Sequence, residues 1–485
     1  MQGHLIGIDV GTTSVKAVML DAAGRRLADF AAGYPTMRPA PGRAEQDPED
    51  WLRLVRRALE RFAAVGGPVA GICVTSQVNT HVFVDGDLGV LHPAIVWQDG
   101  RAAAAGAGLE EAISPEEKTA WLGAPIPVDA SHALARMGWM QAERPEIWAR
   151  CAHVLLPRDW IVGRLTGQLA CDPMSSVGLV TPGLRYADLL IARLPGAAER
   201  LVPLADPLEV VGRIGPGWPL SGTPVVLGMM DAWASLFGLG VARDGEGMYL
   251  SGTSEVMGVV SRSASGEPGV ITFPEWRRVR FHAGPTQSGG ASLDWVARLV
   301  GQDVEGALAM AGPVEDRAPL FLPHLAGERA PIWDAASRGG FAGLSAATGP
   351  EEMVTAVLEG VAFSARLAFE ALERSGGVRV PVIRAGGGGL LSDLWAQMRA
   401  DAFGRPLLRM AGRDPAAVGA AVMAGVGIGA MPDLASAAVA LVQSDRVFEP
   451  DPLAVERADR RFALWRGLYE SLRPINHALA RGSLS

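Results

Sequence analysis

Apolar residues occur in short runs that alternate with helical patterns along the chain. The runs at 5–9 and 15–20 are continuous and short, so each predicts a buried strand. Residues 48–62 instead place apolar side chains three and four positions apart after Asp47-Pro48, which predicts a helix that starts at this pair. Further strands are predicted at 69–74, 154–156, 224–227 and 382–385. Strands alternating with helices favour α/β layers in both halves of the chain.

A pattern of strand, turn and strand occurs twice. The first copy spans residues 5–20 around Gly11-Thr12-Thr13, and the second spans 248–260 around Gly252-Thr253-Ser254. A tight turn with glycine at the bend and hydroxyls beside it presents N–H and O–H donors to an anion. We therefore expect the two turns to hold the phosphates of a nucleotide between two lobes, although one such turn alone is also common in ordinary hairpins.

The length of 485 residues is too great for one comfortable core and predicts two domains. The polar, glycine-rich stretch at 242–247 is the best candidate for their boundary. We accordingly predict an N-terminal domain at 1–244, which contains the first turn, and a C-terminal domain at 245–485, which contains the second.

Composition narrows the range of partners. A net charge of −8 leaves no basic surface for a nucleic-acid backbone. Cys73, Cys151 and Cys171 have neither disulfide nor zinc spacing and suit a reducing compartment. The N-terminus lacks a secretory signal, so we expect a cytoplasmic protein. Residues 415–432 are mostly alanine and glycine between prolines, which predicts a buried helix of small residues and not a membrane span.

Two common phosphate-binding motifs are excluded. A P-loop needs glycine immediately before its lysine, but Val15 precedes Lys16 and Glu117 precedes Lys118. The glycines at 425–429 follow a helical segment and not a strand, so they do not form a dinucleotide-binding turn. A hairpin-type ATP site remains.

Candidate residues follow from this kind of site. Asp9 ends the first strand, where its carboxylate can bind Mg²⁺ through water while the ion offsets phosphate charge. Asp231 stands between the apolar run at 224–230 and an apolar helix at 232–239. It is suited to accept the proton of an attacking hydroxyl as general base and to be a second Mg²⁺ ligand; the alternative is a helix N-cap. The nucleotide-binding candidates of the first hairpin are Gly11, Thr12, Thr13 and Lys16.

Together these residues resemble the FGGY family of carbohydrate kinases over most of the chain. Besides 9–14, the resemblance rests on 93–101, similar to the family's Trp-x-Asp-x-Arg strand, and on 156–167, similar to its Lys/Arg-Asp and Leu-Thr-Gly element. In the second half, 321–344 and 387–397 are similar to its Leu-x-Gly-Glu-Arg-x-Pro segment and its Gly-Gly-Gly turn. The family implies two ribonuclease H-like lobes of the actin and hexokinase type, with a nucleotide and sugar cleft between them, and it implies ATP and Mg²⁺ as cofactors.

The resemblance also implies roles for single residues. Trp97 and Asp99 would lie at the sugar site, although Trp97 is equally suited to a core and Asp99 to fixing the strand end. Adenosine would lie at the glycine turn, where the missing side chains let its rings approach the backbone. The alternative is that the glycines only relieve steric strain in a turn between a strand and a helix. The adenosine-site residues are Gly387, Gly388, Gly389 and Ser392.

The loop after the strand at 69–74 bears on the choice of substrate. Xylulose kinases usually read Gly-Gln-Met-His-Gly there and glycerol kinases Asn-Gln-Arg-Glu-Thr-Thr, whereas this chain has Gln77, Val78 and Asn79. Asn79 offers a donor and an acceptor to adjacent hydroxyls, or it settles a turn. The catalytic turn also departs from the family's Gly-Gly-x-Asp, because it reads Gly-Met-Met-Asp at 228–231.

We therefore predict an ATP-dependent kinase that phosphorylates a hydroxyl of a pentulose such as D-xylulose. Another polyol or ketose (glycerol, erythritol, ribulose or a hexulose) is the alternative substrate, and a non-catalytic sugar sensor is the alternative class, against which Asp231 argues. The expected partner is the small sugar or polyol, with neither nucleic acid nor membrane. Apolar residues at 462–469 are suited to a homodimer face or to packing on their own lobe.

Overall fold

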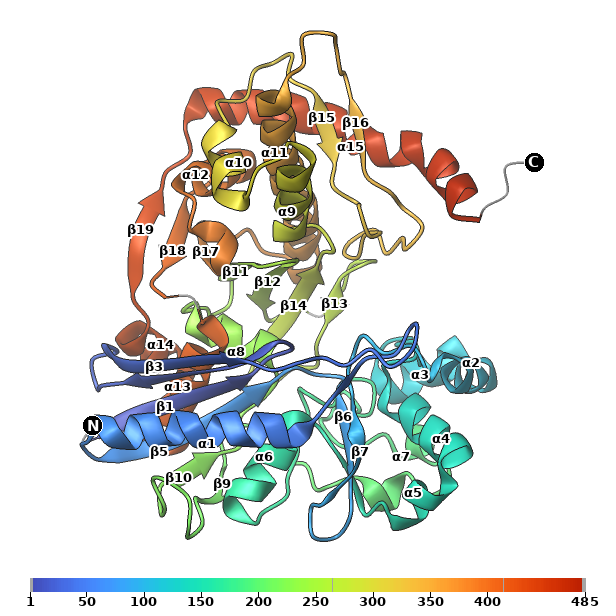
Figure 1. The fold of residues 1–485 in the computed structure, drawn as a ribbon, viewed down its shortest axis with the longest axis vertical. Helices are drawn as coiled ribbons and strands as arrows, with labels where there is room; N and C mark the ends of the chain where they lie inside the picture. The colour runs from blue at the N-terminus through green and yellow to red at the C-terminus, as the bar shows by residue number, and fades with distance from the viewer. Residues whose placement is uncertain (1–2, 264, 413, 482–485) are drawn as a thin grey trace. The chain divides into compact units, whose positions relative to one another are not determined.

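The computed structural model describes residues 3–263, 265–412 and 414–481, and Figure 1 shows its helices and strands. The chain forms two compact units. The first contains the described residues up to Gly240 together with Asp414–Val442, and the second contains the rest of the described chain. The change near Gly240 lies close to the predicted boundary at 244, but the segment 414–442, predicted to be in the second domain, packs in the first unit.

A six-stranded mixed sheet with the order β3-β2-β1-β5-β10-β9 is the frame of the first unit. β1 pairs antiparallel with β2 and parallel with β5. Side chains alternate across β1, so Ile6 and Ile8 enter the apolar core beside α1, while Gly7 and Asp9 face the side covered by α13. The elements are β1 (His4–Val10), β2 (Ser14–Leu20), β3 (Arg26–Gly33), β5 (Val69–Ser76), β9 (Val210–Arg213), β10 (Pro224–Val226), α1 (Pro48–Val65), α8 (Asp231–Gly238), α13 (Pro415–Gly427) and α14 (Leu434–Leu441).

The helix predicted at 48–62 is confirmed as α1. Asp47 caps it by accepting from the N–H of Glu49, and Pro48 occupies the first turn, where its missing N–H costs nothing. The apolar face predicted from the spacing is the buried one, with Trp51 and Phe62 fully enclosed.

α13 is the predicted buried helix of small residues, and its packing explains why it belongs to the first unit. A Cβ atom at Gly419 would lie 1.7 Å from the carbonyl oxygen of Ala234 in α8, and one at Gly7 would lie 1.8 Å from the carbonyl oxygen of Ala417. Only glycine permits backbones to approach this closely. This fit places the segment 414–442 on the first unit's sheet, although in the sequence it lies between β18 and β19 of the second unit.

A four-stranded sheet, β4-β7-β6-β8, and a group of helices complete the first unit around a second apolar core. β7 ends at Ile95, so Trp97 and Asp99 lie in the turn after it and not in a strand as predicted. The elements are β4 (Glu45–Gln46), β6 (His81–Val84), β7 (Val90–Ile95), β8 (His153–Leu155), α2 (Ala103–Ala112), α3 (Pro115–Leu122), α4 (Ala133–Glu143), α5 (Pro145–Arg150), α6 (Pro157–Thr166), α7 (Asp188–Ile191) and η1 (Ala198–Arg200).

The second unit contains a seven-stranded sheet, β13-β14-β12-β11-β17-β18-β19, and a two-stranded sheet, β15-β16. β11 and β12 form the second predicted hairpin, and β17 pairs parallel with β11. The last helix, α15, buries Phe462 and Trp465 within this unit. The elements are β11 (Gly247–Ser251), β12 (Glu255–Ser261), β13 (Ile271–Thr272), β14 (Arg280–Pro285), β15 (Leu320–Leu322), β16 (Gly340–Ala342), β17 (Ile383–Gly386), β18 (Leu407–Met410), β19 (Ser444–Phe448), α9 (Gly290–Leu299), α10 (Val304–Met310), α11 (Pro350–Gly376), η2 (Gly388–Leu390), α12 (Asp393–Phe403) and α15 (Pro452–Arg481).

Cys73, Cys151 and Cys171 are all free thiols in buried positions. Among the helices of the described ranges, none combines the length and the apolar character that crossing a membrane requires.

Candidate active site

Three parallel chain segments end at one edge of the first unit's main sheet. Val10 at the end of β1 pairs with Ser76 at the end of β5, and Ser76 in turn bridges to Met230 beyond β10. The residues that follow these three leave the sheet next to one another: Gly11, Gln77 and Asp231. Open α/β sheets bind ligands outside the carboxyl ends of their strands. The register thus brings together three predicted site residues that are far apart in the sequence.

Asp231 is the first residue of α8, and its Oδ1 accepts from the N–H of Ala232 at 2.7 Å. Met230 occupies the N-cap position, so Asp231 is not the N-cap that the alternative interpretation required. Burial raises the pKa of Asp231 to about 6. A carboxylate with this pKa is mostly ionised at neutral pH and yet basic enough to accept a proton, which suits a general base.

Asp9 lies close to Asp231 and has an unsatisfied oxygen. Burial raises the pKa of Asp9 well above its ordinary value, the charge of Asp231 raises it further, and Lys16 opposes both effects. Its Oδ1 is buried without a hydrogen-bond partner. Buried polar atoms normally have partners, and a bound cation would supply one here. The residues present therefore fit a Mg²⁺ ion.

Such an ion would have few protein ligands. Within the described ranges, no group of three or more His, Cys, Asp or Glu side chains is arranged to hold a metal. Mg²⁺ commonly binds with one or two carboxylates, its remaining ligands being water and substrate phosphate. Asp9 and Asp231 satisfy this requirement.

Lys16 lies opposite Asp9 in the β1–β2 ladder and forms an ion pair that the sequence did not reveal. Its Nζ is 3.2 Å from Oδ1 of Asp414, and Arg26 lies 3.6 Å from the other oxygen of the same carboxylate. Asp414 immediately precedes α13, so its partners lie far from it in the sequence, at the opposite end of the first unit's chain. The lysine is thereby held beside the first hairpin turn.

The first hairpin turn, residues 11–13, is bonded to the predicted sugar loop, residues 77–80. Gln46 donates from Nε2 to the carbonyl oxygen of Thr12 at 2.7 Å and accepts at Oε1 from Nε2 of Gln77 at 2.9 Å. Trp97 donates its indole N–H to the Thr12 hydroxyl at 3.0 Å. The structure therefore brings together the predicted residues Thr12, Gln77 and Trp97. Gln46 carried no motif signal and was missed.

Val78 and Asn79 lie next in this loop and are both partly buried. Asn79 has a φ of 55°, in the left-handed region that asparagine tolerates better than most residues. Its Nδ2 donates to the hydroxyl of Ser131 at 3.4 Å. The backbone conformation agrees with the turn role, and contact of Val78 and Asn79 with a sugar stays a prediction.

Asp99 fixes the turn after β7. Its carboxylate accepts from the N–H of Ala44 at 2.6 Å and from the backbone and guanidinium of Arg101 at 2.7–2.9 Å. These hydrogen bonds outweigh burial and lower the pKa of Asp99. Because both carboxylate oxygens are engaged, the geometry favours the structural alternative over direct contact with a sugar.

Arg136 holds the backbone of the 77–80 loop, and sequence analysis did not find it. Its guanidinium is fully buried and donates to the carbonyl oxygens of Asn79, Ile95 and Val96, the last two at 2.6 Å. Burial lowers its pKa to about 9. An arginine among the apolar residues of 133–140 was the available signal.

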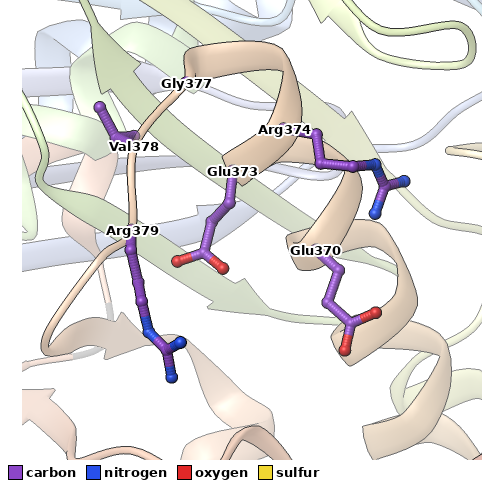
Figure 2. Close-up of a pocket in the computed structure, with 6 residues that line it drawn as sticks. All are labelled: Glu370, Glu373, Arg374, Gly377, Val378 and Arg379. Atoms are coloured by element: carbon purple, nitrogen blue, oxygen red, sulfur yellow. The ribbon is translucent and has the colours of Figure 1, made fainter.

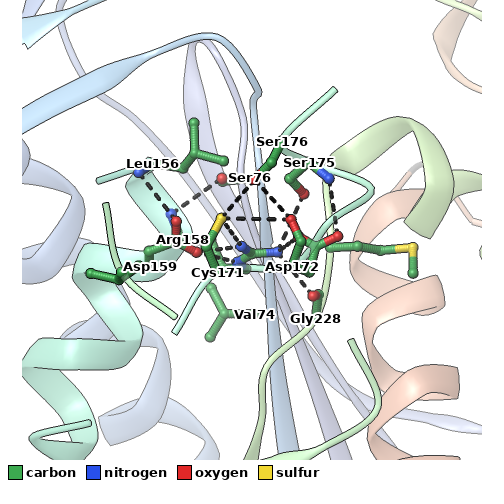
Figure 3. A network of polar contacts seen from close by, with 12 residues as sticks. Val74, Ser76, Leu156, Arg158, Asp159, Cys171, Asp172, Ser175, Ser176 and Gly228 are labelled. Atoms are coloured by element: carbon green, nitrogen blue, oxygen red, sulfur yellow. Dashed lines mark hydrogen bonds and ion pairs between the residues drawn. The ribbon is translucent and has the colours of Figure 1, made fainter. Parts of the chain in front are cut away.

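A second buried arginine, Arg158, lies behind the turn that carries Asp231. Figure 3 shows its guanidinium between Asp159 and Asp172, both of which raise its pKa. It also donates to the carbonyl oxygen of Gly228 at 2.9 Å, and its backbone N–H donates to Ser76 Oγ at 3.2 Å. The family's Lys/Arg-Asp element thus connects the ends of two strands at the site.

In the second unit, the turn 252–254 is supported by the start of α9. The N–H of Gly290 donates to the carbonyl oxygen of Gly252 at 2.8 Å, and that of Ala291 donates to Thr253 at 3.0 Å. Below the turn, Arg399 bonds Glu255 at 2.8 Å and the carbonyl oxygen of Gly389 at 2.7 Å. One buried arginine, absent from the predicted residues, therefore joins the second hairpin to the glycine turn.

Packing accounts for two of the three glycines at 387–389. Gly387 has a φ of 95°, and a Cβ there would lie 2.3 Å from the carbonyl oxygen of Ser251; one at Gly389 would lie 2.2 Å from Ser251 Oγ. A Cβ at Gly388 would meet nothing within 4 Å. Ser392 caps α12 by accepting from the N–H of Trp395 at 3.3 Å. Gly388 is thus the glycine whose missing side chain the fold itself does not require.

A separate hollow of about 440 Å³ lies in the second unit at the end of α11, and it holds none of the predicted site residues. Figure 2 shows charged side chains of both signs around it. Its lining residues are Glu370, Glu373, Arg374, Gly377, Val378 and Arg379.

Comparison with known proteins also divides the chain near residue 240, although the C-terminal family match includes part of the segment 414–442 that packs in the first unit. The sequence matches the N-terminal domain of the FGGY family of carbohydrate kinases over residues 4–238 and the C-terminal domain over 247–428. The xylulose kinase of Escherichia coli strain K12 is 30% identical over 86% of this chain and 89% of its own length. The gluconokinase of Bacillus subtilis strain 168 is 27% identical over 87% of each chain, and the glycerol kinase of Aromatoleum aromaticum is 29% identical over 97% of this chain and 99% of its own.

Solved structures agree with these relatives. A ligand-bound xylulose kinase from Lactobacillus acidophilus matches with a TM-score of 0.89 at 26% identity, covering 97% of this chain and 98% of that one. This match confirms the predicted fold class, an α/β fold with two domains of the actin and hexokinase type. The relatives differ in the substrate they are named for, but all are named as kinases. The chain belongs to the FGGY family of carbohydrate kinases.

Proposed function

We propose that this carbohydrate kinase uses ATP and Mg²⁺ to phosphorylate a hydroxyl of a ketopentose such as D-xylulose. The observation that supports it best is the pair of carboxylates Asp9 and Asp231 at the same sheet edge as the first hairpin turn and the 77–80 loop. A base, a cation site and a phosphate-binding turn are the parts that phosphoryl transfer needs.

Asp231 accepts the proton of the attacking sugar hydroxyl. At the same time the oxygen of that hydroxyl bonds to the transferred phosphorus, and the bond between this phosphorus and the leaving oxygen of ADP breaks. Donors of the turn 11–13 hold phosphate oxygens. For the turn 252–254, phosphate binding stays a prediction from its sequence. Asp9 and Asp231 would hold Mg²⁺, which when bound offsets the charge of the phosphates. Gly388 leaves room for adenosine beside the backbone, and Val78, Asn79 and Trp97 face the sugar. Gln77 is buried in the same loop and supports it through its hydrogen bonds to Gln46 and Thr80.

The choice of a pentulose rests on the relatives and on the loop sequence. Xylulose kinases are among the most similar relatives, and Gln77 matches the glutamine of their usual loop. Val78 and Asn79 match neither xylulose nor glycerol kinases, and a gluconokinase and a glycerol kinase are similarly related. Another ketose or polyol is therefore the alternative substrate, and a sensor without turnover is the alternative class.

An ADP-release assay with a panel of pentuloses, hexuloses, gluconate, glycerol and erythritol tests the proposal. We expect D-xylulose or another pentulose to give the highest kcat/KM. We also expect Asp231→Asn to bind ATP and to lose at least about a hundredfold in kcat, because that is the usual contribution of a general base. Release of ADP without any acceptor sugar would contradict the kinase, and turnover of Asp231→Asn within tenfold of wild type would contradict the base.

A further inference from the structure

Hydrogen bonds close a ring through five residues of the first unit, Thr12, Gln46, Gln77, Thr80 and Trp97. Gln46 donates to the Thr12 carbonyl oxygen at 2.7 Å, and Gln77 donates to Gln46 at 2.9 Å. Thr80 donates to Oε1 of Gln77 at 3.1 Å and accepts from the backbone N–H of Trp97 at 3.2 Å. The indole N–H of Trp97 completes the ring at the Thr12 hydroxyl, 3.0 Å away.

The direction of every bond in this ring is fixed by chemistry. The Thr12 carbonyl oxygen can only accept, so Gln46 must turn its amide nitrogen to it and its oxygen to Gln77. Gln77 must then donate with nitrogen and accept from the Thr80 hydroxyl, since the N–H of Trp97 already donates to that hydroxyl. Hydrogen bonds aligned in this way polarise one another, and Gln46, Gln77 and Thr80 are at most 1% exposed, where the effective dielectric is low.

The ring also determines what Thr12 can offer to a ligand. Its hydroxyl accepts from the indole N–H of Trp97. A hydroxyl has one hydrogen and two acceptor sites, so the hydrogen of Thr12 is oriented away from Trp97 and can donate to an anion. A shift of Trp97 against a sugar would therefore alter the donor that Thr12 presents to phosphate.

We propose that Gln46 is a positioning residue that couples the two substrate sites, so that nucleotide at the turn 11–13 and sugar at the 77–80 loop each strengthen binding of the other. This inference rests on the proposed function, because it takes the two segments as the nucleotide and sugar sites. Gln46 touches neither substrate; it fixes the amide of Gln77 relative to the backbone of Thr12. Coupling of this kind is reciprocal and is commonly about 5- to 150-fold in affinity.

The chain offers isosteric variants on and off the ring. Gln46→Met and Thr80→Val keep side-chain size but remove ring hydrogen bonds. Thr36→Val is the matched control, because Gln46 also donates to the Thr36 hydroxyl at 2.7 Å and this bond lies outside the ring. The thermal unfolding of each variant is measured as well, so that a loss of coupling caused by misfolding can be recognised.

Amide hydrogen exchange with and without a non-hydrolysable ATP analogue and Mg²⁺ measures the coupling without any sugar. In the wild type we expect the analogue to protect residues 10–14 and also residues 75–81. In Gln46→Met and Thr80→Val, protection of 10–14 should persist while that of 75–81 is lost, and Thr36→Val should behave like the wild type. Titration of D-xylulose with and without the analogue should show the same pattern. The ratio of the two affinities should exceed one in the wild type and in Thr36→Val, and it should fall toward one in Gln46→Met and Thr80→Val.

The outcomes separate this inference from the proposed function. Protection of 10–14 alone in the wild type, or protection of 75–81 that survives in both ring variants, overturns the coupling and leaves the kinase intact. Protection of neither segment in the wild type contradicts the nucleotide site itself. Since no sugar is present in the exchange experiment, a failure to phosphorylate pentuloses does not affect its result.

Discussion

The carboxylate of Asp231 lies close enough to Asp9 for its charge to raise the pKa of Asp9. Burial already raises both pKa values, so two negative charges are held where water stabilises them poorly. Such a pair is unfavourable without a cation and favourable with one. The free energy stored there also makes both activity and stability depend on pH.

Activity should fall as Asp231 becomes protonated. With a pKa of about 6, the carboxylate is the active base above this pH and is progressively lost below it. We expect kcat/KM for the sugar to decline roughly tenfold for each pH unit below the pKa of Asp231, which is about 6 without a bound cation. Because Mg²⁺ favours the ionised carboxylate, the midpoint of the profile should move to lower pH as Mg²⁺ is raised. A profile without any decline in an enzyme that remains folded, measured at the lowest Mg²⁺ that supports turnover, would contradict the assignment of Asp231 as base.

Asp231→Asn should stabilise the folded protein at neutral and higher pH. A carboxyl group whose pKa is raised in the folded state costs stability once it ionises, so the cost is absent below about pH 4 and complete above about pH 7. The rise from 3.8 to about 6 corresponds to at most about 3 kcal/mol, and to less here because Asp231 is only partly buried. Denaturant unfolding of the wild type and of Asp231→Asn at pH 4 and pH 8 measures this difference in the free energy of unfolding.

The matched control is Asp87→Asn, at an exposed carboxylate in the loop between β6 and β7. This variant should change the free energy of unfolding equally little at both pH values. If Asp231→Asn gives no greater stability at pH 8 than at pH 4, the pKa of Asp231 is not raised by folding.

Local patterns predicted the parts of the site that lie within one or two elements. Asp9 and Asp231 stand where an apolar strand meets a turn or a helix, and the neighbouring residues alone reveal this. Gln46, Asp414 and Arg399 were missed because their roles depend on partners brought near by the fold, such as Lys16 for Asp414. The sequence assigned the segment 414–442 to the second domain by its position in the chain. The glycine contacts of α13 with α8 and β1 pack it in the first compact unit, and such contacts between distant parts of the chain have no local signal.

The three glycines of the 387–389 turn should respond differently to alanine. Gly387→Ala and Gly389→Ala place a methyl group within 2.3 Å of Ser251 atoms, so both should be destabilised by roughly 1–3 kcal/mol. The methyl group of Gly388→Ala enters open space, so the free energy of unfolding of this variant should lie within about 0.5 kcal/mol of the wild-type value. We expect Gly388→Ala to raise KM for ATP several-fold while KM for the sugar stays constant. An unchanged affinity for ATP would show that adenosine does not approach this turn.

Arg158 should position Asp231 through the carbonyl oxygen of Gly228. Arg158→Met leaves the buried carboxylates Asp159 and Asp172 without their cation, which costs about 3–5 kcal/mol, so the informative variant is Arg158→Lys. Lysine keeps the charge but cannot bond both carboxylates and Gly228 in one plane. We expect kcat to fall at least tenfold with less than a threefold change in KM for ATP, measured by steady-state kinetics. Arg164→Lys is the control, because Arg164 is in the same helix but pairs with Glu49 at the surface; equal kinetics in the two lysine variants would exclude the positioning role.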